Sequence, residues 1–127
     1  MADTPDNKPV VLVVDDDEDI LVLLKRALSS QGYNPAVSPN GENIMDIITQ
    51  SHPDMILLDI HMKGIDGGTV CQLLKTNQTT ADIPVLMVSA HEDIATITRQ
   101  CGADGYIKKP FEPATFRQAI QQLLHQH

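Results

Sequence analysis

Tryptophan is absent from this 127-residue sequence, and the aromatic residues are limited to two tyrosines and two phenylalanines. The hydrophobic fraction is nevertheless 42%, so a core has to be built from aliphatic side chains. A chain of this length buries enough surface for one domain. These features favour an α/β protein over a β-sandwich or a disordered chain.

Positive charge is also scarce. Nine Lys and Arg residues against 17 Asp and Glu residues give a formal net charge of -8, and the basic residues are not clustered. We therefore expect no direct contact with nucleic acid or with an anionic membrane. Basic proteins and divalent cations are the expected partners. The sequence contains no signal peptide and no apolar run long enough to span a bilayer, which predicts a soluble, cytoplasmic protein.

Only two cysteines are present, Cys71 and Cys101, and their spacing matches no metal-binding motif. Both lie in segments with apolar periodicity. We expect them to be reduced thiols in the core of a cytosolic protein.

What the sequence does contain is a regular alternation of short apolar runs and segments of helical periodicity. It begins at Val10, after a polar stretch at residues 1–8 that is predicted to be a flexible leader, and residues 9–127 are expected to form one domain. Strands are predicted at residues 10–14, 36–38, 55–58, 85–88 and 106–108. The helices between them carry five apolar stripes: Ile20, Leu23, Leu24, Ala27 and Leu28; Ile44, Ile47 and Ile48; Val70, Leu73 and Leu74; Ile94, Ile97 and Cys101; and Phe116, Ile120, Leu123 and Leu124.

The second predicted strand is flanked by Pro35 and Pro39 and is only weakly apolar, which places it at the edge of a sheet. Five βα units with right-handed crossovers give a parallel sheet with helices on both faces. We therefore predict a five-stranded, flavodoxin-like, doubly wound (βα)5 fold with the strand order 2-1-3-4-5. In this order the topology reverses between strands one and three, and ligands bind beyond their carboxyl ends.

Acidic residues follow both strands that flank this switch point: Asp15 and Asp16 after the first strand, and Asp59 after the third. Carboxylates that converge repel one another unless a cation joins them. Carboxylate and carbonyl oxygens suit Mg²⁺, with Mn²⁺ as an alternative. The acids at residues 17–19 are instead predicted to begin the first helix, where the helix dipole favours negative charge.

Two further strand ends supply complementary groups. Ser89 and Ala90 follow the fourth strand, and Lys109 follows the fifth. A carboxylate nucleophile, a metal ion, a hydroxyl group and an ammonium group at one edge of a sheet are the components of a phosphoryl-transfer site.

The segments "VVDDD", "DIHMKGIDG", "VLMVSA" and "GADGYIKKPF", in this order and spacing, resemble the receiver domain of the two-component response regulators. The chain is similar to the stand-alone, chemotaxis-type members, from about residue 9 to residue 124. The resemblance implies that Asp59 accepts a phosphoryl group from a histidine kinase or a histidine phosphotransfer protein. It also implies a signalling domain that promotes transfer to its own aspartate and slow autodephosphorylation, rather than an enzyme for an external substrate.

The resemblance assigns metal ligands, phosphoryl-binding groups and a switch to individual residues. The implied metal ligands are Asp15, Asp16, Asp59 and the backbone carbonyl of His61. The implied phosphoryl-binding groups are the hydroxyl of Ser89, the backbone of Ala90 and the ammonium of Lys109, whose bond to Pro110 is expected to be cis.

Ser89 and Tyr106 together would form the switch. The ring of Tyr106 would turn inward as Ser89 moves, and so remodel the face made by the fourth helix, the fifth strand and the fifth helix for a downstream protein partner. A phosphoryl group adds roughly -1.5 to -2 charges, which is enough to bias a two-state element. The alternative is a strand tyrosine that is packed for its apolar area.

Two histidines occupy positions that border the phosphoryl group in this family: His61, two residues after Asp59, and His91, two residues after Ser89. Imidazole titrates near neutral pH, so we hypothesise that they tune the phosphoryl lifetime between about pH 5 and pH 8. The alternative is two exposed histidines without effect. Lys63 stands where the family commonly has proline, and its side chain is expected in solvent.

Two rival interpretations remain. The pair Asp15 and Asp17 after an apolar strand imitates the nucleophile motif of haloacid-dehalogenase-like phosphohydrolases, although Glu18 departs from that motif. The chain could also be a receiver-like module that binds partners without phosphorylation. The sequence leaves open the cognate kinase, the output partner, the oligomeric state, and whether the chain is a complete regulator or part of a longer one.

Overall fold

The computed structural model describes residues 8–62 and 64–125. Within them, five parallel strands form one sheet in the order β2-β1-β3-β6-β7. These strands are β1 (Val10–Val14), β2 (Asn34–Ser38), β3 (Met55–Asp59), β6 (Val85–Ser89) and β7 (Gly105–Lys108). The predicted order 2-1-3-4-5 is confirmed, with the proline-containing strand β2 at one edge.

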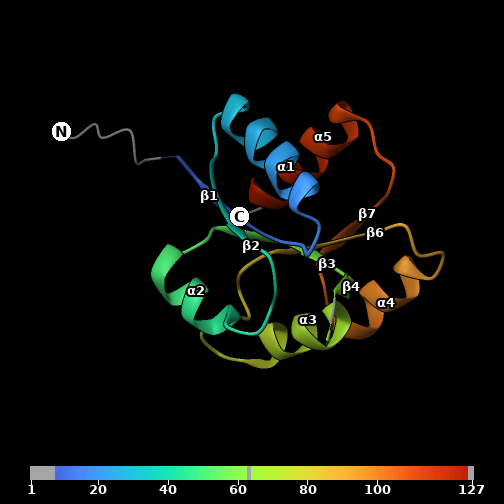
Figure 1. Cartoon of the computed structure of the whole chain (residues 1–127). Coiled ribbons are helices and arrows are strands. Elements are labelled where there is room, and N and C mark those ends of the chain that lie inside the picture. Colours follow the sequence, from blue (N-terminus) through green and yellow to red (C-terminus); the bar gives the residue numbers. More distant parts are fainter. Residues whose placement is uncertain (1–7, 63, 126–127) are drawn as a thin grey trace.

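Helices cover both faces of this sheet. They are α1 (Glu18–Ser30), α2 (Ile44–Ser51), α3 (Gly67–Thr76), α4 (Ile94–Cys101) and α5 (Pro113–Leu124). Figure 1 shows α1 and α5 on one face and α2, α3 and α4 on the other. The predicted doubly wound α/β fold is therefore confirmed.

Two apolar clusters, one on each face of the sheet, form the core. Side chains alternate along β1: Val11 and Val13 pack with the cluster under α1 and α5, whereas Leu12 and Val14 pack with the cluster under α2, α3 and α4. Every residue of β3 and β6 is buried. This double burial is the reason that the central strands read as continuous aliphatic runs in the sequence.

The predicted helix stripes are wrong at two leucines. Leu23 on α1 is 60% exposed and Leu73 on α3 is 49% exposed. The sheet instead receives Leu21, Leu24 and Leu28 from α1. In α3, Cys71 takes the buried position that the sequence pattern gave to Leu73.

The helix boundaries have local causes in the sequence. Asp17 caps α1 by accepting hydrogen bonds from the backbone N–H groups of Asp19, at 2.9 Å, and Ile20, at 3.4 Å. The acids at residues 17–19 therefore begin this helix, as predicted. Gly102 ends α4 with φ +82°, a conformation that favours glycine.

A short antiparallel ribbon joins β3 to α3. It pairs β4 (His61–Met62) with β5 (Ile65–Asp66) and holds the chain beside the carboxyl end of β3. The sequence does not predict this ribbon, because two-residue strands carry no hydrophobic periodicity. Asp66 then caps α3, accepting a hydrogen bond from the Gly68 N–H at 3.2 Å.

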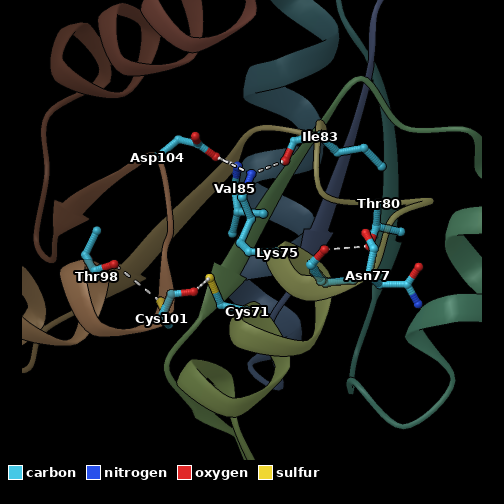
Figure 2. Close-up of polar contacts among 10 residues, drawn as sticks. Cys71, Lys75, Asn77, Thr80, Ile83, Val85, Thr98, Cys101 and Asp104 are labelled. Atoms are coloured by element: carbon cyan, nitrogen blue, oxygen red, sulfur yellow. Dashed lines mark hydrogen bonds and ion pairs between the residues drawn. The ribbon is translucent and has the colours of Figure 1, made fainter.

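At the amino-terminal edge of the sheet, carboxylates bind the first N–H groups of two strands. Asp54 accepts a hydrogen bond from Val10 at 2.7 Å, and Asp104 accepts one from Val85 at 2.8 Å. Lys75 donates to the same Asp104 oxygen at 2.9 Å and to the Ile83 carbonyl at 3.0 Å (Figure 2). These bonds tie α3, β6 and the loop before β7 together.

Some predictions fall on residues 1–7 and 63, which lie outside the described part of the chain. These predictions are the flexible leader at residues 1–8, of which only Lys8 is described, and the solvent-exposed side chain of Lys63. Among the helices described, none has both the length and the apolar character needed to cross a membrane.

Candidate functional site at the carboxyl edge of the sheet

The carboxyl ends of β1 and β3 bring three acids together. Oxygens of Asp15, Asp16 and Asp59 all lie within 4.8 Å of one another. Asp15 is 2% exposed and Asp59 is 7% exposed, so two of the carboxylates are removed from bulk water. This convergence follows from the parallel pairing of β1 with β3, which places both strand ends at one edge.

Asp15 is held by three polar contacts. Its backbone N–H donates to the Ser38 carbonyl at 3.1 Å, which continues the pairing of β1 with β2. Its Oδ1 accepts from the Asp17 N–H at 2.9 Å, and its Oδ2 accepts from Lys109 Nζ at 3.2 Å. These contacts fix the carboxylate at the turn between β1 and α1.

Burial and the neighbouring acids raise the pKa of Asp59. The largest cause is desolvation, followed by the charge of Asp15, and together they raise the pKa from 3.8 to about 6. The ammonium of Lys109 and a hydrogen bond from the backbone N–H of His61 act in the opposite direction. At neutral pH most of the chains therefore carry an ionised Asp59 that lacks full charge compensation.

Lys109 is the cation that the structure places beside this cluster. Its Nζ lies 3.2 Å from Asp15 Oδ2 and 4.0 Å from Asp59 Oδ1. The bond between Lys109 and Pro110 is cis, as expected. With all groups ionised, three carboxylates face one ammonium, so the donor set fits a hard divalent cation with oxygen ligands.

Ser89, the last residue of β6, is 2% exposed. Its Oγ accepts a hydrogen bond from the His91 N–H at 3.0 Å, and its carbonyl accepts one from the Lys109 N–H at 2.9 Å. The exposed residue Ala90 follows directly. Because β3 pairs with β6 and β6 pairs with β7, Ser89 and Lys109 reach the same edge as Asp59.

His61 and His91 meet at this edge. Their ring centroids lie 5.0 Å apart at an interplanar angle of 41°. The Nδ1 atom of His91 accepts a hydrogen bond from the Asp93 N–H at 3.0 Å, which orients its ring. The two histidines expected near Asp59 are thus neighbours of each other, a contact that the sequence did not predict.

Tyr106 is not part of the carboxylate cluster. It lies on β7, opposite Met87 of β6, and is 47% exposed. It lines a groove of about 610 Å³ with residues of α5 and the loop before it. Its ring therefore faces outward in this structure.

Gly67 is a positioning residue that the sequence motifs did not single out. Its N–H donates to the Ile60 carbonyl at 2.8 Å. A Cβ at this position would collide with the Asp59 carbonyl oxygen and would lie 2.7 Å from the Ile60 Cα. The absence of a side chain lets α3 begin against the backbone of the central carboxylate.

A family model described as the response regulator receiver domain matches residues 11–121. The chain belongs to this receiver domain family. Receiver domains are signalling domains rather than enzymes for external substrates. The dehalogenase-like alternative also loses its second carboxylate, because Asp17 is exposed and its oxygen caps α1.

Curated relatives of this receiver domain include regulators of transcription. A "Probable transcriptional regulator ycf27" from Cyanophora paradoxa is 39% identical over 93% of this chain and 49% of its own length. The "DNA-binding dual master transcriptional regulator RpaA" from Synechocystis is 36% identical over 91% of this chain and 49% of its own length. The chain spans about half the length of these relatives.

Solved structures share the receiver fold. A putative response regulator from Chloroflexus aurantiacus superposes with a TM-score of 0.86 at 31% identity, covering 93% of this chain and 98% of that one. The receiver domain of a signal transduction histidine kinase from Syntrophus aciditrophicus gives 0.83 at 27% identity, covering 91% and 89%. Chemotaxis protein CheY4 of Vibrio cholerae, at 24% identity and a TM-score of 0.85, covers 92% and 99% and has the same fold.

Proposed function

We propose that this receiver domain is the phosphoacceptor of a two-component phosphorelay, with Asp59 as the residue that is phosphorylated. The observation that carries the proposal is the convergence of Asp15, Asp16 and Asp59 at one edge, with Lys109 beside them. In the reaction a carboxylate oxygen of Asp59 attacks the phosphorus of a phosphohistidine, and the bond between phosphorus and the imidazole nitrogen breaks. The donor is a histidine kinase or a histidine phosphotransfer protein.

Three carboxylates and a carbonyl form the proposed metal site. Asp15, Asp16, Asp59 and the backbone carbonyl of His61 would hold Mg²⁺, with Mn²⁺ as the alternative ion. When bound, the ion supplies positive charge that offsets the carboxylates and gathers the phosphoryl oxygens. Burial of Asp15 and Asp59 supports this assignment, because buried acids without a cation destabilise one another.

Three other groups would contact the phosphoryl oxygens. Lys109 lies close enough to Asp59 to exchange its contact with Asp15 for one with a phosphoryl oxygen. Ser89 already accepts a hydrogen bond from His91, which leaves its own hydroxyl proton available as a donor. The backbone of Ala90 follows at the same edge and is assigned the remaining contact.

Ser89 and Tyr106 are proposed as the switch. They lie on neighbouring strands, and the outward-facing tyrosine borders the groove beside α5. Movement of Ser89 toward a phosphoryl group would open space for the ring to turn inward. The face made by α4, β7 and α5 would then change shape, and we assign the downstream protein partner to this face.

His61 and His91 are proposed to tune the lifetime of the phosphoryl group. Their rings meet beside the strand end that carries Asp59, where they would limit the path of an attacking water. Slow autodephosphorylation would then depend on both rings.

The expectation of no direct nucleic-acid contact applies to this domain alone, since relatives of about twice its length include a DNA-binding regulator.

Incubation of the purified chain with a small phosphodonor and MgCl₂, read by intact mass, tests the proposal. We expect a gain of one phosphoryl group that requires the metal and is absent from Asp59→Asn. Asp46→Asn, which removes an exposed acid from α2, is the matched control and should be phosphorylated like the parent chain. No adduct on the parent chain would favour the phosphorylation-independent binding module, and an equal adduct on Asp59→Asn would exclude Asp59 as the acceptor.

A further inference from the structure

Two cysteines meet in the contact between α3 and α4. Cys71 lies on α3, and Cys101 is the last residue of α4. Figure 2 shows the Cys71 thiol donating to the Cys101 carbonyl, at 3.5 Å, and the Cys101 thiol donating to the Thr98 carbonyl, at 3.6 Å. Both cysteines are free thiols and both are buried.

Two glycines flank this pair at the contact between the helices. A Cβ on Gly68 would lie 3.4 Å from Cγ2 of Ile97, and a Cβ on Gly102 would lie 3.5 Å from the Lys75 Cβ. Residues 68, 71 and 75 therefore form one stripe of α3 that faces the end of α4. The ion pair of Lys75 with Asp104, at 2.9 Å, links α3 to the loop that follows α4.

A cavity of about 250 Å³ between the two helices borders one of the two cysteines. It is lined by Asp66, Gly68, Gln72, Ile97, Gln100 and Cys101. Cys101 borders this cavity and is 6% exposed, whereas Cys71 is fully buried behind it. A small polar oxidant would therefore reach Cys101 first.

We propose that Cys71 and Cys101 are a dithiol that a hydroperoxide oxidises to an intramolecular disulfide, tying α3 to α4. In the first step the sulfur of Cys101 attacks one oxygen of hydrogen peroxide and the O–O bond breaks. The thiol proton joins the leaving hydroxyl, so Cys101 sulfenic acid and one water form. In the second step the sulfur of Cys71 attacks the Cys101 sulfur. The S–O bond breaks, and the hydroxyl leaves with the proton of Cys71 as a second water.

The electrons balance in this sequence, because the two thiols lose two electrons and the peroxide gains them. The environments of the two residues match their roles. Burial raises the pKa of the Cys71 thiol, so Cys71 keeps its proton near neutral pH, and this proton leaves with the hydroxyl in the second step.

The disulfide would act on the proposed switch, and this consequence rests on the proposed function. Helix α4 borders the output face and has only three buried side chains, those of Ile94, Thr98 and Cys101. A covalent bond from its last residue to α3 would restrain the helix while leaving the carboxylate cluster untouched. Oxidised protein should thus accept a phosphoryl group but respond to it less at α4.

The test exposes the folded full chain to hydrogen peroxide and counts thiols after denaturation. We expect the loss of both thiols, a mass decrease of two hydrogens and a crosslinked peptide joining residues 71 and 101. Dimedone, which traps sulfenic acids, should label Cys101 in Cys71→Ala but not in the parent chain. Persistence of both thiols in the folded protein, or oxygen addition to single cysteines instead of a crosslink, would overturn the proposal.

A second arm compares reduced and oxidised protein after treatment with the phosphodonor. Amide hydrogen exchange in α4 should change on phosphorylation at least about threefold less in the oxidised form, and Cys71→Ala should abolish this difference. Equal changes in both forms would overturn the restraint of α4. The disulfide arm requires no phosphorylation, so failure of the Asp59 chemistry is recognised separately by the absence of a phosphoryl adduct in both forms.

Discussion

Lys109 lies nearer to Asp15 than to Asp59, at 3.2 Å against 4.0 Å. The ammonium thus lies closer to Asp15, a proposed metal ligand, than to Asp59, the proposed phosphoacceptor. A divalent cation entering the cluster has to share Asp15 with this lysine. Metal affinity and the position of Lys109 are therefore coupled.

Replacing Lys109 by methionine should raise the affinity for Mg²⁺. Removal of one positive charge a few ångströms from the ion should strengthen binding roughly tenfold, or about 1.4 kcal/mol after solvent screening. Titration with MgCl₂ followed by calorimetry measures this change. Lys108→Met is the matched control, because that lysine is the exposed neighbour on β7. If both variants bind Mg²⁺ alike, Lys109 does not compete with the ion.

The raised pKa of Asp59 predicts how stability depends on pH in metal-free buffer. The folded chain ionises this group near pH 6 and the unfolded chain near pH 4. Between these values the folded state retains a proton that the unfolded state has lost. The stabilisation present below about pH 4 is therefore lost as the pH rises through about 6, by roughly 1 to 3 kcal/mol.

Asp59→Asn should remove this decline. Urea unfolding with EDTA, at a series of pH values between about 4 and 8, compares the variant with the parent chain. The variant should gain stability relative to the parent as the pH rises, and Asp46→Asn should follow the parent. A constant difference between Asp59→Asn and the parent would show that Asp59 titrates normally.

Among the elements, the start of α3 packs directly against the backbone of Asp59 and helps to hold it in place. Gly67→Ala would force a methyl group against the backbone of Asp59 and Ile60. We expect a loss of roughly 1 to 3 kcal/mol in unfolding free energy, together with slower phosphorylation of the folded fraction.

Gly68→Ala is the control on the same helix. Its added methyl group would meet Ile97 at 3.4 Å and the Asp66 carboxylate beyond 3.5 Å, so its neighbours need to move only slightly. A gain in helix propensity offsets this, and the stability should change by less than about 1 kcal/mol. Equal losses in the two glycine variants, measured by urea unfolding, would contradict the special role of Gly67.

The sequence predicted strands better than helix faces, for a physical reason. Strands buried on both sides are aliphatic throughout, so their location does not depend on which face is inward. In α1 five apolar residues follow one another at residues 20–24, and two stripes fit this pattern equally well. Packing on the sheet decides between them, which is why Leu21 is buried and Leu23 is exposed.

The candidate site was predictable to the extent that it follows from strand order. Once β1 and β3 are neighbours, the acids at their ends have to converge. Which of two acids Lys109 contacts depends on differences below 1 Å, and no residue pattern encodes these. The meeting of His61 with His91 and of Cys71 with Cys101 similarly depends on loop and helix positions in three dimensions.

For the molecule as a whole, Mg²⁺ should stabilise the fold. An ion that binds only the folded state adds about 1.4 kcal/mol at ten times its dissociation constant, which corresponds to a rise of about 5 °C in Tm for a domain of this size. Thermal unfolding with MgCl₂, against NaCl of equal ionic strength, measures the effect. It should vanish in Asp15→Asn and persist in Asp19→Asn, which removes an exposed acid from the first turn of α1. A Tm that ignores Mg²⁺ in the parent chain would count against the metal site.

The hydrogen bonds at the amino-terminal edge of the sheet give the domain one clamped end. Asp54 and Asp104 hold the first N–H groups of β1 and β6, whereas the opposite strand ends carry acids whose charge is only partly balanced. The sheet is thus held rigidly at its amino-terminal edge, and its carboxyl edge is free to rearrange. Rearrangements that begin at Asp59 should therefore not extend to the amino-terminal edge. A protein that contacts only the clamped end should therefore bind the phosphorylated and unphosphorylated forms equally well.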